Sequence, residues 1–155
     1  MKIKIKLDDG AFAPESAHAA DAGYDLFATR DFVVPKTSAE TAGYDGWYVG
    51  SAAIGYAIHD TGVHVEIPEG YVGFLKSKSG LNVKFGLTGE GVIDSGYTGS
   101  IVAKLYNHTA KDVVFKRGDK IIQLVLLPII KPDIEIVDSL EETERGDNGF
   151  GSTGR

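Results

Sequence analysis

The sequence predicts an all-β protein that folds as one domain. Apolar and polar side chains alternate with a period of two in most segments, as they do along half-buried strands. Short turn-forming runs, among them Pro68-Glu69-Gly70 and Arg117-Gly118-Asp119, separate these segments. A chain of 155 residues with 43% hydrophobic residues is sufficient for a single core. Many short strands with such turns are typical of a sandwich or a barrel.

The elements follow from this pattern in chain order. The first residues, MKIKIKLDDG, alternate lysine with apolar side chains, which predicts a strand at the N-terminus. The longest apolar run is 121–130, which Gln123 and Pro128 interrupt. A single helix is expected, from Ser79 to about Phe85, with Ser79 as a candidate N-cap. The predicted strands are 2–7, 24–28, 32–34, 62–66, 70–76, 100–107, 113–115, 121–128 and 133–136.

Two segments do not fit a series of strands joined by short turns. Residues 37–60 are rich in Gly and Ala and carry four aromatic residues, namely Tyr44, Trp47, Tyr48 and Tyr56. Residues 141–155 begin with acidic side chains and continue with Gly, Ser, Thr and Asn around Phe150. Connections of this length are usually functional or disordered. We expect 37–60 to be an inserted loop and 141–155 to be a flexible C-terminal arm.

Composition excludes several kinds of protein. There is no cysteine, which excludes disulfides, thiolate catalysis and cysteine-ligated zinc. The net charge of −6 argues against a general nucleic-acid binder, which needs a basic face. No run reaches the roughly 18 apolar residues that span a bilayer, and the N-terminus is unlike a signal peptide. We expect a cytoplasmic protein that binds neither nucleic acid nor membrane. The four histidines, His18, His59, His64 and His108, lack metal-ligand spacing and are interpreted as structural or surface residues.

The C-terminal segment 145–154 has a composition suited to phosphate binding. It reads Arg-Gly-Asp-Asn-Gly-Phe-Gly-Ser-Thr-Gly. Glycines allow successive N–H groups to point into one concavity that holds phosphate oxygens. Ser152 and Thr153 add hydroxyl donors, Arg145 adds a bidentate cation, and Phe150 is able to stack on a base. A flexible terminus without a ligand is the alternative.

Two further segments carry polar groups at turns. Lys78, Ser79 and Gly80 precede or begin the expected helix, where N–H groups and a cation attract an anion. An ordinary strand-to-helix turn is the alternative. Asp94 lies where the segment 91–99 turns in a predicted hairpin, and its carboxylate is able to accept a proton from water. An Asx-type turn is the competing role for Asp94.

Together these segments resemble the five ordered motifs of the trimeric dUTPase family. The motifs are Ala22-Gly-Tyr-Asp-Leu26, Ser-Lys-Ser-Gly-Leu at 77–81, Gly-Val-Ile-Asp-Ser-Gly-Tyr-Thr-Gly at 91–99, Gly118-Asp-Lys-Ile-Ile-Gln-Leu124, and the glycine-rich segment 145–154. The resemblance covers nearly the whole chain except 37–60. It implies a distorted β-barrel or jelly roll that assembles as a homotrimer with active sites at subunit interfaces. The implied reaction is hydrolysis of dUTP to dUMP and pyrophosphate, which keeps uracil out of DNA and supplies dUMP.

The resemblance also implies roles for individual residues. Asp94 would orient and deprotonate the water that attacks the α-phosphorus, and Asp25 would help to hold the water shell of a Mg²⁺ ion. Tyr97 would pack against C2′ of the deoxyribose and exclude a ribose. The implied uracil contacts come from the hairpin at Thr88, Val92, Ile93 and Val102. The implied triphosphate contacts are Lys78, Ser79, Gly80 and Gln123, and a C-terminal lid would add Arg145, Phe150, Gly151, Ser152 and Thr153.

This chain departs from the family pattern at two places. Lys78 stands where the family usually has arginine, so the charge is kept but the bidentate fork is lost. The connection 37–60 is longer than the family leads us to expect, and three interpretations stay open: a loop near the active site, a docking surface for a protein partner, or a tolerated insertion.

Two other functions are compatible with parts of this sequence. A dCTP deaminase looks like the same fold, but Lys104 occupies the position of that family's catalytic glutamate. The other rival is a regulatory protein that acts through 37–60.

Overall fold

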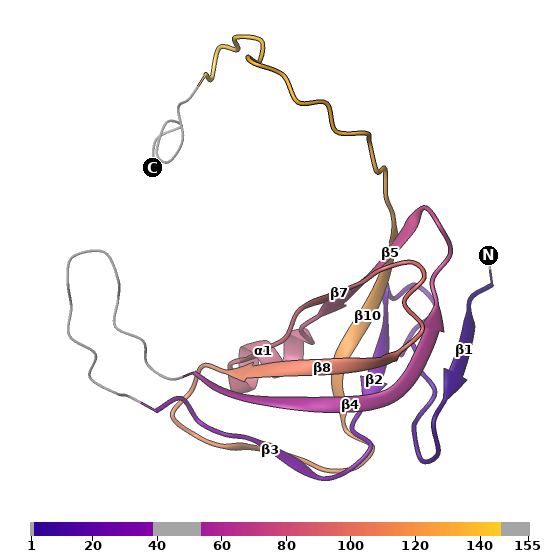
Figure 1. Ribbon diagram of the computed structural model, residues 1–155. Coiled ribbons are helices and arrows are strands. Elements are labelled where there is room, and N and C mark those ends of the chain that lie inside the picture. The colour runs from indigo at the N-terminus through magenta and orange to yellow at the C-terminus, as the bar shows by residue number, and fades with distance from the viewer. Residues whose placement is uncertain (1, 39–53, 147–155) are drawn as a thin grey trace.

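The computed structural model describes residues 2–38 and 54–146. The described chain is built mainly from antiparallel strands, with one short helix (Figure 1). The strands in chain order are β1 (Lys4–Leu7), β2 (Gly23–Phe27), β3 (Phe32–Val34), β4 (Gly55–Glu66), β5 (Tyr71–Lys76), β6 (Leu87–Thr88), β7 (Gly91–Ile93), β8 (Ser100–Asn107), β9 (Val113–Phe115) and β10 (Lys120–Pro128). The helix α1 (Ser79–Phe85) lies between β5 and β6.

Two four-stranded sheets face each other across the core. One sheet has the strand order β1-β4-β8-β6 and the other has the order β2-β10-β5-β7. A third, two-stranded sheet joins β3 and β9. Sequential neighbours are often not paired, since β4 pairs with β8 and β10 lies between β2 and β5. This is the jelly-roll architecture, and in the described residues the sheets do not close into a continuous barrel.

The core is formed by the inward-facing residues of both sheets. The first sheet contributes Val63, Val65, Ile101, Ala103 and Leu105, all at most 2% exposed. The second contributes Leu26, Leu75, Ile93, Ile122 and Leu124. Along β8 the exposure alternates between buried and less buried positions, as the period of two predicted. Packing between the two sheets therefore fixes which face of each strand is available for a ligand.

The alternating pattern located most elements correctly. The strands at 32–34, 100–107 and 113–115 and the helix at 79–85 have the predicted bounds. Four more predicted strands, at 2–7, 24–28, 70–76 and 121–128, differ by one or two residues at their ends. The all-β prediction is confirmed. The hairpin predicted around Asp94 was wrong as a pair of hydrogen-bonded strands: β7 pairs with β5 in one sheet and β8 pairs with β4 and β6 in the other, so the turn at 94–99 connects the two sheets.

The boundary predicted for the inserted loop was wrong on its C-terminal side. Residues 55–60 are not a loop but the first half of β4, where Gly55 pairs with Asn107 and Asp60 pairs with Val102. The Gly- and Ala-rich composition hid this strand. Gly55 has no room for a side chain, since an added Cβ would lie 1.8 Å from the carbonyl oxygen of Pro35. The aromatic residues Tyr44, Trp47 and Tyr48 lie outside the described residues, so the three interpretations of that segment stay predictions.

The predicted strand at 133–136 was also wrong. Residues 129–146 follow β10 as an arm without a helix or strand, and they extend away from the sheets (Figure 1). Ile134 is 92% exposed and Ile136 is 95% exposed. An alternating pattern makes a strand only when a neighbouring strand accepts its backbone hydrogen bonds. Within the described residues, 133–136 have no such neighbour, and the arm is bonded only at its start, where the Ile129 N–H donates to the carbonyl oxygen of Gly70.

No helix in the described residues is long and apolar enough to cross a membrane.

Candidate active site

The turn that connects β7 of one sheet to β8 of the other carries the predicted water-activating residue, Asp94. The backbone N–H of Tyr97 donates to the carbonyl oxygen of Asp94 at 3.2 Å and closes the turn. Gly96 has φ +87°, a conformation that side-chain-bearing residues rarely adopt. The Tyr97 hydroxyl donates to the carbonyl oxygen of Ser100 at 3.0 Å. The turn is thus closed by its own backbone and is tied to the first residue of β8.

A cavity of about 250 Å³ opens beside this turn. Five residues predicted from the sequence line it together with Ser100, which was not predicted: the set is Val92, Ile93, Asp94, Tyr97, Ser100 and Val102. Val92 is 59% exposed and Val102 is 44% exposed, so both present apolar surface rather than filling the core. Asp94 is exposed. The cavity thus combines an apolar wall, an aromatic ring and an accessible carboxylate.

Thr88 does not line this cavity, although the resemblance implied a contact with uracil. It lies on β6 opposite Tyr106, and its hydroxyl is 2.7 Å from Nε2 of His108. The neighbouring Gly89 N–H donates to Oγ of Ser77 at 2.9 Å. Thr88 is therefore beside β8 and next to the residue that follows β5.

A second cluster of predicted residues gathers around Asp25 on β2. This carboxylate is buried and accepts hydrogen bonds from the ammonium groups of Lys78, on Oδ1, and Lys120, on Oδ2. The Lys120–Asp25 distance is 3.0 Å, and Lys120 also reaches Glu15 at 2.9 Å. Burial raises the pKa of the Asp25 carboxyl, but the hydrogen bonds from Lys78 and Lys120 outweigh it, so the pKa lies below its ordinary value. Asp25 is ionised at neutral pH.

Gln123 connects this cluster to the end of β5. It lies on β10 directly between Asp25 on β2 and Lys76 on β5. Its amide nitrogen donates to the carbonyl oxygen of Ser77 at 3.1 Å. Lys78 precedes α1, which begins with Ser79 and Gly80, and the position of a Cβ on Gly80 is open space. The structure therefore brings Lys78, Ser79, Gly80 and Gln123 to one end of the second sheet, beside Asp25.

The two clusters lie apart within one chain. Asp94 follows Ile93, which pairs with Gly73 on β5, whereas Asp25 pairs with Gln123, which pairs with Lys76 on β5. The strand order places β7 and β2 at opposite edges of their sheet. From strand spacing and rise, the backbones of Asp94 and Asp25 are on the order of 20 Å apart.

The protein groups near Asp25 suit a metal that is bound largely through other ligands. In residues 2–38 and 54–146 no three His, Cys, Asp or Glu side chains gather to hold an ion. Asp25 offers carboxylate oxygens, and Glu15 is a second carboxylate bonded to the same lysine, Lys120. Mg²⁺ commonly retains several waters and is held by one or two carboxylates and substrate phosphates. The arrangement fits that mode and not an all-protein metal cage.

The predicted lid is described only at its start. Arg145 lies at the end of the arm and is exposed, and Gly146 has φ +50°. Phe150, Gly151, Ser152 and Thr153 lie outside the described residues. Their assignment to the lid stays a prediction.

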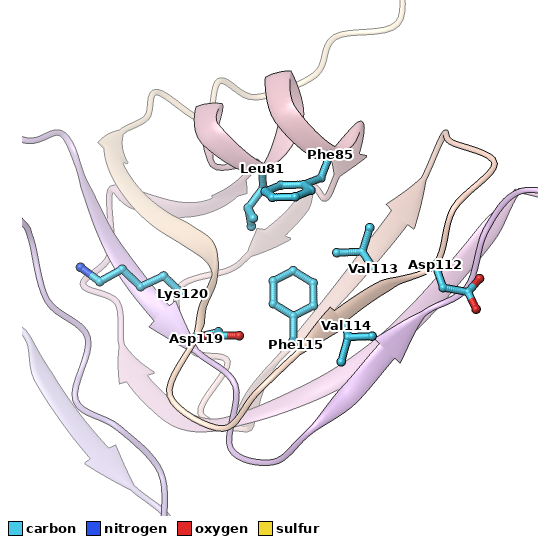
Figure 2. Close-up of a pocket in the computed structure, with 8 residues that line it drawn as sticks. All are labelled: Leu81, Phe85, Asp112, Val113, Val114, Phe115, Asp119 and Lys120. Atoms are coloured by element: carbon cyan, nitrogen blue, oxygen red, sulfur yellow. The ribbon is translucent and has the colours of Figure 1, made fainter.

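A larger cavity, of about 380 Å³, lies between α1 and β9. Figure 2 shows Leu81 and Phe85 of the helix above the ring of Phe115, with Val113 beside it. Lys120 also lines this cavity, but its ammonium group bonds to Asp25 and Glu15. The centre is apolar and offers few groups to match the polar edge of a base. We do not assign it to the nucleotide.

Comparison with known proteins shows the family of this chain. The sequence profile of the dUTPase family matches residues 10–154. The chain belongs to the dUTPase family. The deoxyuridine 5'-triphosphate nucleotidohydrolase of Candida glabrata is 37% identical over 157 residues, which cover 100% of this chain and 96% of the relative. That of Paramecium bursaria Chlorella virus 1 is 39% identical over 150 residues, covering 96% and 94%.

Solved dUTPase structures share the fold. The dUTPase of Staphylococcus bacteriophage 80alpha with dUPNHPP is 30% identical, covers 99% of each chain and superposes with a TM-score of 0.81. The dUTPase of phage phi11 of S. aureus, described with a species-specific insert, is 27% identical, covers 92% of this chain and 100% of its own, and has a TM-score of 0.73.

The enzyme is thus a dUTP diphosphatase that hydrolyses dUTP, as the motifs predicted. The deaminase alternative is not favoured. Two polar residues at the dUTPase clusters were not assigned from the sequence. Lys120 stands inside the fourth motif, where its charge was a usable signal. Ser100 follows the third motif directly, but a lone serine in a strand carries no comparable signal.

Proposed function

We propose that dUTP binds with its uracil and deoxyribose in the cavity beside the 94–99 turn and that Asp94 activates the attacking water. The observation that carries this proposal is the cavity itself, where Asp94 stands exposed next to the Tyr97 ring and the apolar side chains of Val92 and Val102. Backbone groups of β7 and β8 beside this turn would match the polar edge of uracil and leave no room for the methyl group of thymine. A cytosine would leave donors and acceptors unpaired, which is costly in a desolvated site.

In this proposal each group has a limited task. Asp94 holds a water by hydrogen bonding and accepts its proton as the oxygen attacks the α-phosphorus, and pyrophosphate leaves. Tyr97 packs against C2′ of the sugar and excludes a 2′-hydroxyl by contact. Lys78, Ser79, Gly80 and Gln123 bind phosphate oxygens, and the segment from Arg145 to Thr153 covers the substrate. Thr88 supports β8 from the neighbouring strand. Val92, Ile93 and Val102 surround the uracil ring.

Mg²⁺ is the proposed cofactor, and it would neutralise charge on the triphosphate. Asp25 would hold it through water, since a buried and ionised carboxylate with two lysine partners is suited to an outer position. A related dUTPase from phage phi11 is described with a structural Mg(II) ion.

The direct test compares wild type with Asp94→Asn in a pyrophosphate-release assay with dUTP and Mg²⁺. The amide keeps the shape of the side chain but accepts no proton, so turnover should fall by about 10²-fold or more. Because Asp94 is exposed, the melting temperature should stay close to that of wild type. Ser95→Ala is a matched control on the same turn. A variant with undiminished turnover contradicts the assignment.

We also propose that the enzyme works as a homotrimer with shared active sites. Within one chain, Asp94 is on the order of 20 Å from Asp25, which is too far for one triphosphate to use both groups comfortably. The exposed arm supports the same proposal, because Ile130, Ile134 and Ile136 are all more than 90% exposed. Side chains of this kind favour a contact with another surface.

Mixed oligomers test the shared site. Asp94→Asn and Lys78→Ala should each be poorly active, whereas co-refolded mixtures should regain up to about a quarter of wild-type activity, because some interfaces then combine two intact halves. Refolding each variant alone is the control. A mixture no more active than its components, in a sample whose mass shows a trimer, contradicts sharing.

A second role in protein binding is proposed for the segment around residues 39–53. Phage dUTPases, among them that of 80alpha, are described as controlling the transfer of virulence genes. The dUTPase of phage phi11 is described with a species-specific insert. Deleting 41–52 should separate the two roles, because β4 begins only at Gly55. Hydrolysis of dUTP should be retained and protein binding by the segment lost. Loss of hydrolysis in a folded deletion variant would instead indicate an active-site loop.

A further inference from the structure

His64 lies between the N-terminal strand β1 and the 94–99 turn that connects β7 to β8. It is on β4, where its backbone pairs with Lys6 of β1 on one side and Ser100 of β8 on the other. Its Nδ1 is 2.8 Å from the carbonyl oxygen of Thr98, the residue after Tyr97. Its Nε2 is 3.1 Å from both carboxylate oxygens of Asp8. The side chain is 18% exposed, so these contacts are partly shielded from water.

Both partners of the His64 ring can only accept hydrogen bonds. The Thr98 carbonyl and the ionised Asp8 carboxylate carry no proton, so each contact needs an N–H on the ring. Neutral imidazole has one N–H and imidazolium has two. The two contacts are therefore satisfied together only when His64 is protonated. In the neutral ring the single N–H goes to the ionised Asp8 carboxylate, which is the stronger acceptor, so the bond to the Thr98 carbonyl is the one that is lost.

A bulge in β4 brings His64 to this position. The register between β4 and β8 shifts between Asp60 and His64, and Gly62 has φ +65° within the shift. Asp60, at the start of the bulge, accepts hydrogen bonds from Oγ of Ser100 and, at 3.0 Å, from the N–H of Gly62. The Tyr97 hydroxyl in turn donates to the carbonyl oxygen of Ser100. The turn that carries Tyr97 is thus held from the bulge at both Thr98 and Ser100.

We propose that His64, as an imidazolium between Asp8 and the Thr98 carbonyl, is a positioning residue that fixes Tyr97 and thereby helps the enzyme to select dUTP over UTP. The inference rests on the proposed role of Tyr97 as the wall against a 2′-hydroxyl. The Tyr97 ring excludes a 2′-hydroxyl only if the ring does not move. A hydrogen bond that fixes the neighbouring Thr98 carbonyl therefore affects the selectivity for dUTP over UTP. Asp8 extends the anchor to the segment that follows β1.

The charges around His64 favour its protonated form. The hydrogen bonds to Thr98 and then to Asp8 raise the pKa of the His64 imidazole above its ordinary value of 6.5, against the opposing charge of Lys6. From the 94–99 turn, only the neutral Thr98 carbonyl faces the His64 ring. The same strand adds Asp60, bonded to Ser100, and Glu66, paired with Lys4. Positioning by the imidazolium is therefore complete below pH 6.5 and is lost as the pH rises through the raised pKa.

The test is the ratio of kcat/KM for dUTP to that for UTP, measured from about pH 6 to about pH 9. Effects on the chemical step that both substrates share cancel in this ratio. In wild type the ratio should decline on the alkaline side. In His64→Ala it should be about tenfold lower at acidic pH and should show no decline. In Asp8→Asn the decline should move to lower pH, because removal of the carboxylate lowers the pKa of His64.

His64→Asn separates positioning from a general loss of structure. The asparagine amide places an N–H close to the position of Nδ1, so it keeps the bond to Thr98 without titrating. The ratio should stay near the acidic wild-type value at every pH. Tyr97→Ala tests the premise, since it should lower the ratio by itself.

The outcomes are distinguishable. If Tyr97→Ala lowers the ratio and both His64 variants leave it at the wild-type value with the same pH dependence, the role of His64 is overturned and that of Tyr97 stands. If none of the three variants changes the ratio, both are overturned. Should His64→Ala fail to fold, a ratio that declines with pH in His64→Asn as it does in wild type overturns the proposal.

Discussion

The Lys78 ammonium donates a hydrogen bond to Oδ1 of Asp25, so a predicted phosphate ligand and a predicted metal-shell ligand bind each other. The bond links the residue before α1 to β2, which are neighbours only in the tertiary structure. Lys120 occupies the other carboxylate oxygen. The two ammonium groups and the carboxylate are therefore already bonded to one another before any ligand is added. Substrate phosphates would compete with Asp25 for the lysines, and a metal ion would compete with the lysines for Asp25.

Asp25→Asn should lower stability in a pH-dependent manner. The pKa of Asp25 is depressed in the folded chain, so its stabilising effect is present above the unfolded value of 3.8 and is lost as the pH falls through the folded pKa. At neutral pH the free energy of unfolding should fall by about 2 kcal/mol, since two charge-assisted hydrogen bonds to a buried carboxylate are weakened. Denaturant titrations at about pH 7 and about pH 3 measure the difference.

The exposed pair Lys116–Asp31 supplies a control for that experiment. Their side chains are 69% and 59% exposed, so Asp31→Asn should change stability much less than Asp25→Asn does. An Asp25→Asn penalty that is equally large at both pH values would contradict the linkage.

Lys78→Ala and Lys78→Arg should affect substrate binding in different directions. Removal of the cation should raise KM for dUTP by about tenfold, because a charged phosphate contact is lost. Arginine should lower KM relative to wild type, since its planar guanidinium group is able to bind two phosphate oxygens. Steady-state kinetics at fixed Mg²⁺ measure both. Lys84→Ala, in the last turn of α1, is a charge-matched control that should leave KM unchanged.

Asn107→Leu should destabilise the fold without a direct effect on the site. The buried Asn107 amide donates to the carbonyl oxygens of Val34 and Lys111, at 3.1 and 2.8 Å. Its oxygen accepts from the backbone N–H and the hydroxyl of Thr109. Leucine of similar size leaves these groups unpaired, which should cost about 3 kcal/mol or more. Thermal unfolding measures the loss, and a melting temperature equal to that of wild type would refute it.

Deleting residues 147–155 should impair catalysis and spare the fold. The removed residues contain Phe150, Gly151, Ser152 and Thr153 of the predicted lid, whereas β10 ends at Pro128 and the core lies before it. We expect kcat/KM to fall by about 10²-fold or more with little change in melting temperature. Phe150→Ala in the full chain is the matched point variant. Retained kcat/KM in the deletion would contradict a lid.

Local patterns explain how much of the molecule the sequence predicted. Strands such as 100–107 are marked by alternation between a buried and an exposed face, and the helix at 79–85 begins at the predicted serine. The prediction of Ser79 as the N-cap was wrong, because the N-cap is Lys78, whose side chain makes no cap hydrogen bond. The turn at 94–99 was predictable because Asp and Gly both favour turns, and Gly96 has the positive φ that glycine adopts readily. By contrast, β4 was only half recognised, because its first residues are selected by pairing with β8 and not by their own composition.

The sequence by itself determined the all-β class, the family and the identity of the residues in the five motifs, because these depend on side-chain chemistry and on order along the chain. Only the tertiary structure decided which of those residues meet. It joined Asp25 to Lys78 and Lys120, set Asp94 at the far edge of the same sheet, and placed His64 against Thr98. The reason is that strand order and register bring together residues dozens of positions apart, and those long-range pairings are written in the packing of the core and not in any local pattern.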